Sequence, residues 1–166
     1  MSPFGMAIVV PTLELFANEF QSSYSIIQFI ISAYLFGLAI SQPFMGFLSD
    51  KLGRKPVMIS GIILFIIASY ICMTAETLST LIVARFLQGV GGSVGTVTSR
   101  AIIRDSYSGD QAAKSLSRVT ATMGMAPMIA PVVGAIALSI LGSPSGIFLI
   151  TLLIGFLILI PVLFFF

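Results

Sequence analysis

Residues 46–75 read GFLSDKLGRKPVMISGIILFIIASYICMTA, which is a short charged turn followed by a stretch that carries no charge from Pro56 to Ala75. A helix needs about 20 mostly apolar residues to cross a bilayer. The whole chain resembles this stretch, because 57% of its 166 residues are hydrophobic and 8% are charged, whereas soluble domains carry about 25% charged residues. We therefore expect an integral membrane protein.

Six apolar stretches follow one another, separated by charged or polar residues. The predicted spans cover residues 2–16, 25–48, 56–75, 78–103, 112–141 and 146–166. They are too long for membrane strands and lack the two-residue alternation of a barrel. The sequence thus predicts an all-α membrane protein in which residues 1–166 form one bundle of six transmembrane helices.

The charged residues of the connections predict an orientation. Seven of the eight basic residues lie at the second–third and fourth–fifth connections: Lys51, Arg54, Lys55, Arg100, Arg104, Lys114 and Arg118. The other connections carry Glu14, Glu19 and Glu76 and no Lys or Arg. Since Lys and Arg in short loops stay cytoplasmic, we expect both basic connections, and with six spans both chain ends, on the cytoplasmic side.

Composition also excludes several functions. A net charge of +2 with clustered charges does not favour nucleic-acid binding. The chain has no histidine and one cysteine, Cys72, so a zinc or iron site lacks ligands and no internal disulfide can form. No nucleophile–base pair is visible. We expect no cofactor, no metal and no enzymatic activity.

Arg85 lies well inside the fourth predicted span, where a charge is costly and by default indicates function. The same span carries Gln88, Gly89, Gly92, Ser93, Thr96 and Ser99 at helical spacing on one stripe. Such small and polar residues suit close helix packing or a water-filled path. The alternative is that Arg85 extends to the outer interface, because it lies only about seven residues into the helix.

Two other spans carry features of this kind. The second has Gln28, Ser32, Ala39, Gln42 and Gly46 at helical spacing, and Gln28, Ser32 and Gln42 are candidates for lining a cavity, although packing alone explains them as well. The fifth has Gly124, Pro127, Pro131 and Gly134. Prolines remove backbone donors and kink a helix, so this span holds either a static kink or a bending element.

The turn at 46–56 is built to reverse the chain. Gly53 can accept a positive φ where the second span ends, Pro56 suits the first turn of the third, and Asp50 can pair with nearby cations or cap a helix. By spacing alone, this is no more than a basic loop that fixes topology.

Together these features resemble the major facilitator superfamily. The loop GFLSDKLGRK is similar to its signature G-x-L-a-D-x-x-G-R-K, matching at Gly46, Leu48, Asp50, Gly53, Arg54 and Lys55. RFLQGVGGS at 85–93 resembles the R-x-x-Q-G-x-G motif of drug:proton antiporters, and APVVGA at 130–135 their proline-glycine motif. SPFGMAIVVP near the start, RAIIRDSYSGDQAAKSLS and the APMIAPVVG run resemble the bicyclomycin and chloramphenicol-type multidrug efflux group.

The resemblance implies the N-terminal half of a twelve-helix antiporter in the bacterial inner membrane, which exports small drug-like compounds in exchange for protons and thereby confers antibiotic resistance. Arg85, with Gln88 and Gly89, would take part in proton coupling or gating. Asp50, Arg54 and Arg104, with the rest of the loop motif, would belong to a charged cytoplasmic latch. Pro127, Pro131 and Gly134 would form the antiporter-type kink.

Two departures from the family pattern and two abrupt ends leave alternatives open. Ala7 stands where the group often has a carboxylate, no Asp or Glu lies deep in a predicted span, and LGSPSG at 141–146 lacks a Trp-Arg pair. The ends carry no flanking anchors, so we expect a truncated chain. Its partner is either a missing C-terminal six-helix half or a second copy in a homodimer; a non-transporting fragment or membrane subunit is the remaining alternative.

Overall fold

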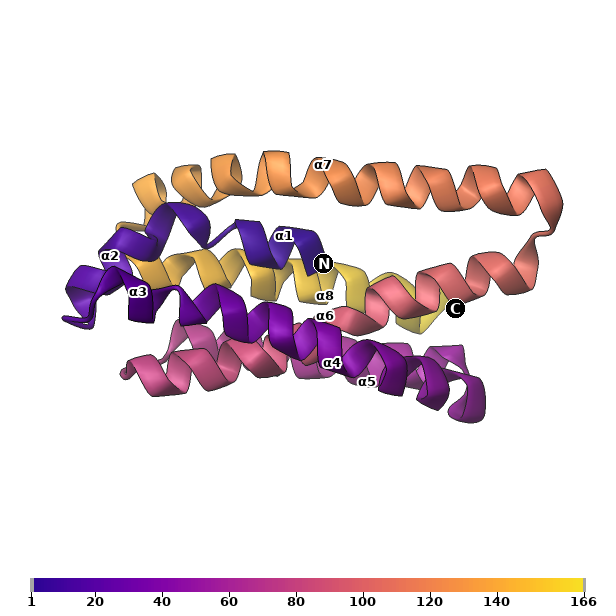
Figure 1. The fold of residues 1–166 in the computed structure, drawn as a ribbon, viewed down its shortest axis with the longest axis horizontal. Coiled ribbons are helices and arrows are strands. Elements are labelled where there is room, and N and C mark those ends of the chain that lie inside the picture. The colour runs from indigo at the N-terminus through magenta and orange to yellow at the C-terminus, as the bar shows by residue number, and fades with distance from the viewer. Residues whose placement is uncertain (1, 166) are drawn as a thin grey trace.

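The computed structural model describes residues 2–165, and this part of the chain is helical without strands (Figure 1). The elements in chain order are α1 (Ser2–Ala7), η1 (Val10–Thr12), α2 (Leu13–Glu19), α3 (Tyr24–Ile27), α4 (Phe29–Leu52), α5 (Arg54–Met73), α6 (Leu78–Ser106), α7 (Gly109–Leu141), η2 (Pro144–Gly146) and α8 (Ile147–Phe165). Five helical segments, beginning with α3–α4, are long and apolar enough to cross a membrane, which confirms an all-α membrane protein.

The first predicted span differs from the expectation, because residues 2–19 form three short pieces rather than one helix. Pro11 explains the break. A proline has no N–H to donate, and its ring clashes with the carbonyl four residues earlier. That carbonyl belongs to Ala7, where α1 ends, and the chain continues through a 3₁₀ turn into α2.

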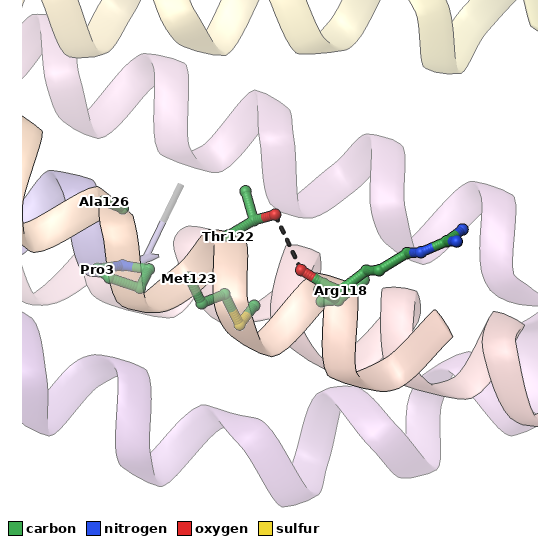
Figure 2. A pocket seen from close by; sticks show the side chains of 6 residues that line it. Pro3, Arg118, Thr122, Met123 and Ala126 are labelled. Carbon is green, nitrogen blue, oxygen red and sulfur yellow. Dashed lines mark hydrogen bonds between the residues drawn. The ribbon is translucent and has the colours of Figure 1, made fainter. Parts of the chain in front are cut away.

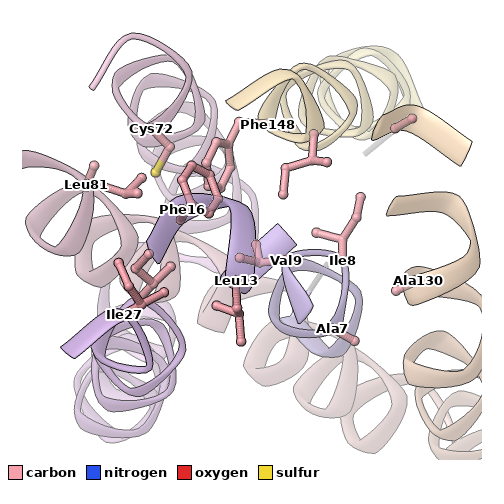
Figure 3. Close-up of a cluster of buried hydrophobic side chains, with 14 residues drawn as sticks. Ala7, Ile8, Val9, Leu13, Phe16, Ile27, Cys72, Leu81, Ala130 and Phe148 are labelled. Atoms are coloured by element: carbon pink, nitrogen blue, oxygen red, sulfur yellow. The ribbon is translucent and has the colours of Figure 1, made fainter. Parts of the chain in front are cut away.

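The first segment nevertheless packs inside the bundle. Phe16 of α2 is 1% exposed and lies against Phe148 of α8, with ring centroids 6.2 Å apart. Figure 3 shows Phe16 beside Cys72 and Leu81, which come from α5 and α6. Contacts between these side chains stabilise this end of the bundle through van der Waals packing, which is the main attraction between helices surrounded by lipid.

Helix α6 forms the centre of the bundle, with 56% of its most apolar stretch buried against 17% for α7. Glycines allow its backbone to approach α4 and α5. A methyl group on Gly89 would overlap the carbonyl oxygen of Tyr34, and one on Gly91 would meet the backbone of Phe65. Small residues at such positions are the usual means by which membrane helices pack.

The ends of the helices separate the connections as the loop charges predict. In Figure 1 the α4–α5 and α6–α7 connections lie at one end, and the α2–α3, α5–α6 and α7–α8 connections lie at the other. The basic residues of the two former connections thus share one side. Helix α7 runs along an edge of the bundle beside α1, which leaves much of its apolar surface uncovered (Figure 1).

The close approach of α6 to α4 predicts that Gly89→Ala lowers stability. The added methyl group must displace the α4 backbone, and overpacking costs about 1–3 kcal/mol. Thermal unfolding of the purified protein, followed by circular dichroism, should show a lower Tm. The matched control is Gly95→Ala on the same helix, where a methyl group would meet nothing within 4 Å. Equal Tm values for the two variants would contradict this packing.

Candidate functional site

Arg85 lies at the centre of the bundle with 0% of its surface exposed. Its guanidinium donates three hydrogen bonds: from Nε to the Ile30 carbonyl at 3.3 Å, from Nη2 to the Gly5 carbonyl at 3.0 Å, and from Nη1 to Oε1 of Gln88 at 2.5 Å. Arg85 therefore does not extend to the outer interface, and the interior placement is confirmed.

Two aromatic rings complete the surroundings of this guanidinium. Its carbon atom lies 4.4 Å from the ring centroid of Tyr34 and 5.8 Å from that of Phe148. A cation over an aromatic face is attracted by the ring quadrupole, more strongly where water is excluded. Arg85 is thus contacted from α1, α4 and α8 while it projects from α6.

Gln88, one helical turn further along α6, extends this network. Its amide nitrogen donates to Oγ of Ser69 at 2.7 Å and to Oγ1 of Thr151 at 3.2 Å. Both hydroxyls in turn donate to carbonyls in their own helices. Each buried side-chain nitrogen and oxygen in the described part of the chain has at least one hydrogen-bond partner. The Arg85–Gln88 network thus joins α1, α4, α5, α6 and α8 with no nitrogen or oxygen left without a partner.

The break in the first segment supplies one of these acceptors. The last four carbonyls of a helix have no partner within it. Because α1 ends at Ala7, the carbonyl of Gly5 lies in that last turn and accepts from Arg85. Glycine is the residue that position 5 accommodates, because a methyl group there would lie 2.8 Å from the hydroxyl of Tyr34 and would clash with it.

Neutral groups, rather than a carboxylate, surround Arg85. The two ion pairs found in the described part of the chain both involve Arg54, and no acid contacts Arg85 among these residues. Arginine stays protonated even when buried. The bundle therefore holds a permanent positive charge that carbonyl dipoles and aromatic rings stabilise.

A second polar network lies at the start of α5. Arg54 donates from Nη1 to Oδ1 of Asp50 at 2.6 Å, and from Nη2 and Nε to Oδ2 of Asp105 at 3.0 and 3.2 Å. Nη1 also reaches Oγ of Ser49 at 2.6 Å. The contacts with Asp50 and Asp105 join the ends of α4, α5 and α6.

The remaining residues of the loop motif have separate positions. Gly53 adopts φ +93° between α4 and α5, the left-handed region that favours glycine. Gly46 faces Val97 of α6, and Nζ of Lys55 donates to the Leu163 carbonyl at 3.4 Å. Arg104 is not part of the Arg54 network; its neighbour Asp105 is. A latch between two halves stays a prediction.

The three cavity candidates on α3–α4 fall into two places. Gln28 and Ser32 are exposed and line a pocket of about 360 Å³ with Leu13 and Tyr24, at the end of the bundle that carries the α2–α3 connection. Gln42 is half-buried and lines two other pockets toward the opposite end. These side chains thus line separate pockets of the described bundle, and whether they line a transport cavity stays a prediction.

Three adjoining pockets lie between α1, α4, α6 and α7, and we call them the basic groove. Their volumes are about 270, 550 and 350 Å³. The first two share Gln42, Thr96 and Arg100, and the first and third share Pro3 and Met123. Figure 2 shows the third pocket, where Pro3 faces the α7 side chains.

Helix α7 continues through both of its prolines, from Gly109 to Leu141. Gly134 has a packing role, because a methyl group there would overlap the carbonyl oxygen of Ile8. It thus brings α7 against the broken first segment. Whether the helix bends at Pro127 and Pro131 during function stays a prediction.

Several members of the two networks were not identified from the sequence. Ser69, Tyr34 and Thr151 look like ordinary polar residues within apolar spans, and Gly5 contributes only a carbonyl. For Asp105 a signal existed, since it is one of two acids, with Asp110, in a connection that we expect on the same side as the basic turn at 51–55. The sequence does not say which of the two acids pairs with Arg54.

Comparison with known proteins decides the family. The family model of the Major Facilitator Superfamily matches residues 1–166. The chain belongs to this superfamily.

Relatives within the superfamily match with moderate identity. The chain is 36% identical over 158 residues to the uncharacterized MFS-type transporter YdgK of Bacillus subtilis, covering 95% of the chain and 39% of that relative. It is 36% identical over 134 residues to the multidrug resistance protein MdtL of Shewanella sp. ANA-3, covering 81% and 34%, and 33% identical over 168 residues to MdtL of Vibrio parahaemolyticus, covering 96% and 42%. The chain thus spans well under half the length of these superfamily members.

The hydrogen bond from Arg85 to Gln88 predicts that Gln88→Leu destabilises the bundle. Leucine leaves Nη1 of Arg85 without its acceptor, and an unsatisfied buried polar group costs about 1–3 kcal/mol. A lower Tm of the purified protein is expected. Gln42→Leu is the matched control, because Gln42 is half-buried and lines a pocket instead. A Tm for Gln88→Leu no lower than that of Gln42→Leu would show that the network contributes nothing to stability.

Proposed function

We propose that residues 1–166 form the N-terminal six-helix bundle of a transporter that exports small drug-like or metabolite compounds across the cytoplasmic membrane in exchange for protons. Membership of the superfamily supports transport, and the relatives named as multidrug resistance proteins support export of such compounds. The bundle would act with a second one, either a C-terminal half or a second copy, since the chain covers 34–42% of these relatives.

The observation that carries the proposal is the buried charge of Arg85. A static bundle gains little by holding a guanidinium away from water, because a leucine in its place would pack without the desolvation cost. A charge within a membrane is instead typical of ion paths and coupling sites. Its hydrogen bonds to backbone carbonyls of α1 and α4 connect two helices that border the basic groove.

In this proposal, the hydrogen bond from Arg85 to Gly5 breaks when the transporter changes conformation. It is the hydrogen bond from Arg85 to α1, and the same helix lines the groove through Pro3 and Met6. Loss of that bond would free α1 to move relative to α6 and would alter the groove. Arg85 would then gate or couple, with Gln88 as its anchor and Gly89 as the residue that keeps α4 close.

The charges at the helix ends support an orientation for the proposed transporter. Both basic connections lie at one end (Figure 1), and basic connections face the cytoplasm. We place the Arg54 network and the wide end of the basic groove on that side of the bacterial inner membrane. With six crossings, both chain ends would face the cytoplasm too.

We expect Arg85→Ala to abolish export by the protein that still reaches the membrane. In cells that express the complete gene product, efflux of chloramphenicol, an uncharged drug, should fall at least about tenfold, which corresponds to roughly 1.4 kcal/mol. The physical reason is that alanine removes the two hydrogen bonds that link α6 to α1 and α4. It also removes the bond to Gln88 on α6 itself. Efflux is compared at equal protein abundance in the membrane.

Lys114→Ala serves as the control, since Lys114 is an exposed cation on α7 and its removal changes net charge equally. Unchanged efflux in the Arg85→Ala cells would remove Arg85 from the mechanism. Equal loss in both variants would point to net charge rather than to the buried site.

The Arg54 network gives a separate expectation for Asp105→Asn. The Asp105 side chain is 59% exposed, so its ion pair contributes at most about 1 kcal/mol to stability, and Tm should change little. Efflux should fall severalfold, because α6 loses its charged contact with α5 at the end where the helices would rearrange. Asp110→Asn, an exposed acid in the first turn of α7, should leave both quantities unchanged. Normal efflux in Asp105→Asn would show that the network serves topology alone.

A further inference from the structure

The basic groove contains cations that no acid of residues 2–165 neutralises. Arg100 lines both the pocket of about 270 Å³ and that of about 550 Å³, Arg104 lines the latter, and Arg118 lines the third pocket. All three are exposed, and their guanidinium groups make no hydrogen bond or ion pair within residues 2–165. Arg85 on α6 differs, since each of its three guanidinium nitrogens donates a hydrogen bond.

The acids of the chain lie elsewhere. Asp50 and Asp105 are bound to Arg54. Glu14, Glu19 and Glu76 belong to the opposite end of the bundle (Figure 1). Asp110 is exposed on the first turn of α7 and lines none of the three pockets. Residues 2–165 therefore give the groove a positive potential, and no carboxylate among these residues lines it.

The remainder of the lining is apolar where Arg100 meets the bundle. The smallest of the three pockets also contains Met6, Leu35, Leu38 and Met123. Pockets of about 300–1,000 Å³ with an apolar wall and a few placed polar groups are typical of small-molecule sites. The groove thus offers a charged contact beside a surface that accepts a hydrophobic body.

The depth of Arg100 also suits a ligand that arrives from the cytoplasm. At about 1.5 Å per residue, Arg100 lies about 33 Å along α6 from Leu78, which is close to the thickness of the hydrocarbon region, about 30 Å. Arg100 is therefore at the end of the bundle that carries the basic connections, where the groove meets water.

We infer that the basic groove binds amphipathic organic anions of small size, with the carboxylate on Arg100 and the apolar body against Leu35 and Leu38. This substrate class rests on the proposed transport function, because it names what that transporter would accept. Arg104 and Arg118 raise the local concentration of anions at the mouth, since clefts lined by one sign of charge focus the field. A guanidinium binds a carboxylate by charge-assisted hydrogen bonds.

The test measures binding by the complete gene product in nanodiscs of phosphatidylcholine. Equilibrium dialysis compares naphthylacetate with its neutral isostere naphthylacetamide, which has the same ring and nearly the same shape. The acid should bind roughly tenfold more tightly than the amide, as expected for one charge-assisted contact. Equal affinities would overturn the inference.

Three variants locate the contact. Arg100→Gln should reduce the preference for the acid to about none while amide binding persists, which shows that the groove is intact. Lys114→Gln removes a cation from α7 that lines none of the three pockets, and should keep the preference. If Arg100→Gln does not bind the amide, the Arg104→Gln variant is measured instead, and its preference for the acid should be severalfold weaker than that of the unchanged protein. An unchanged preference in the arginine variant that is measured overturns the inference.

Anionic lipid is the competing occupant, because phosphatidylglycerol headgroups would meet the same guanidinium groups. In nanodiscs that contain phosphatidylglycerol, the acid should still bind more tightly than the amide, since its ring enters the apolar part of the groove. Loss of the preference there would assign the groove to lipid and overturn the inference.

Efflux in cells separates this inference from the proposed function. Binding of naphthylacetate, without export of it or of chloramphenicol beyond the vector control, would refute export and leave the anion site standing. Export of chloramphenicol by a protein that binds acid and amide equally would support export and refute the anion site. Export of naphthylacetate that falls in Arg100→Gln would support both.

Discussion

The burial of Arg85 without a carboxylate is the constraint on which the rest of the bundle depends. A guanidinium cannot lose its proton inside the protein, so each of its three nitrogens needs at least one neutral acceptor. Backbone carbonyls from α1 and α4 and the Gln88 amide supply them. Satisfying the charge in this way requires helices distant in the sequence to meet at one point, and this determines which helices surround α6.

That requirement explains two features that look like defects. The interruption at Ala7–Pro11 prevents a regular first span, yet it exposes the Gly5 carbonyl that Arg85 needs. Glycine at position 89 lowers helix propensity, yet it allows α4 to come close enough for Ile30 and Tyr34 to contact the guanidinium. In both cases the helix that carries the feature becomes less stable by itself, while the Arg85 network gains a contact with another helix.

The sequence predicted features that depend on composition and on short spacing. The apolar runs, the grouping of basic residues and the glycine turn at Gly53 follow from such patterns, and the interior position of Arg85 followed from its place in a span. The backbone acceptors of Arg85 could not be predicted, because every residue has a carbonyl and the side chains do not indicate which carbonyl accepts. Asp105 was missed because its partner Arg54 lies 51 residues away, and a single sequence does not report such pairs.

Helix α6 carries two kinds of arginine, and the difference between them follows from depth. At Arg85 the bundle is closed on all sides, so the charge is satisfied internally and serves the arrangement of helices. At Arg100 the contact between α6 and α7 has opened into the basic groove, so the charge faces a hollow instead of a carbonyl. A conformational change that moves α1 away from Arg85 would also alter the groove at Pro3 and Met6. The two arginines would thereby be coupled through α1 and α4, because both helices contact Arg85 and also line the groove beside Arg100.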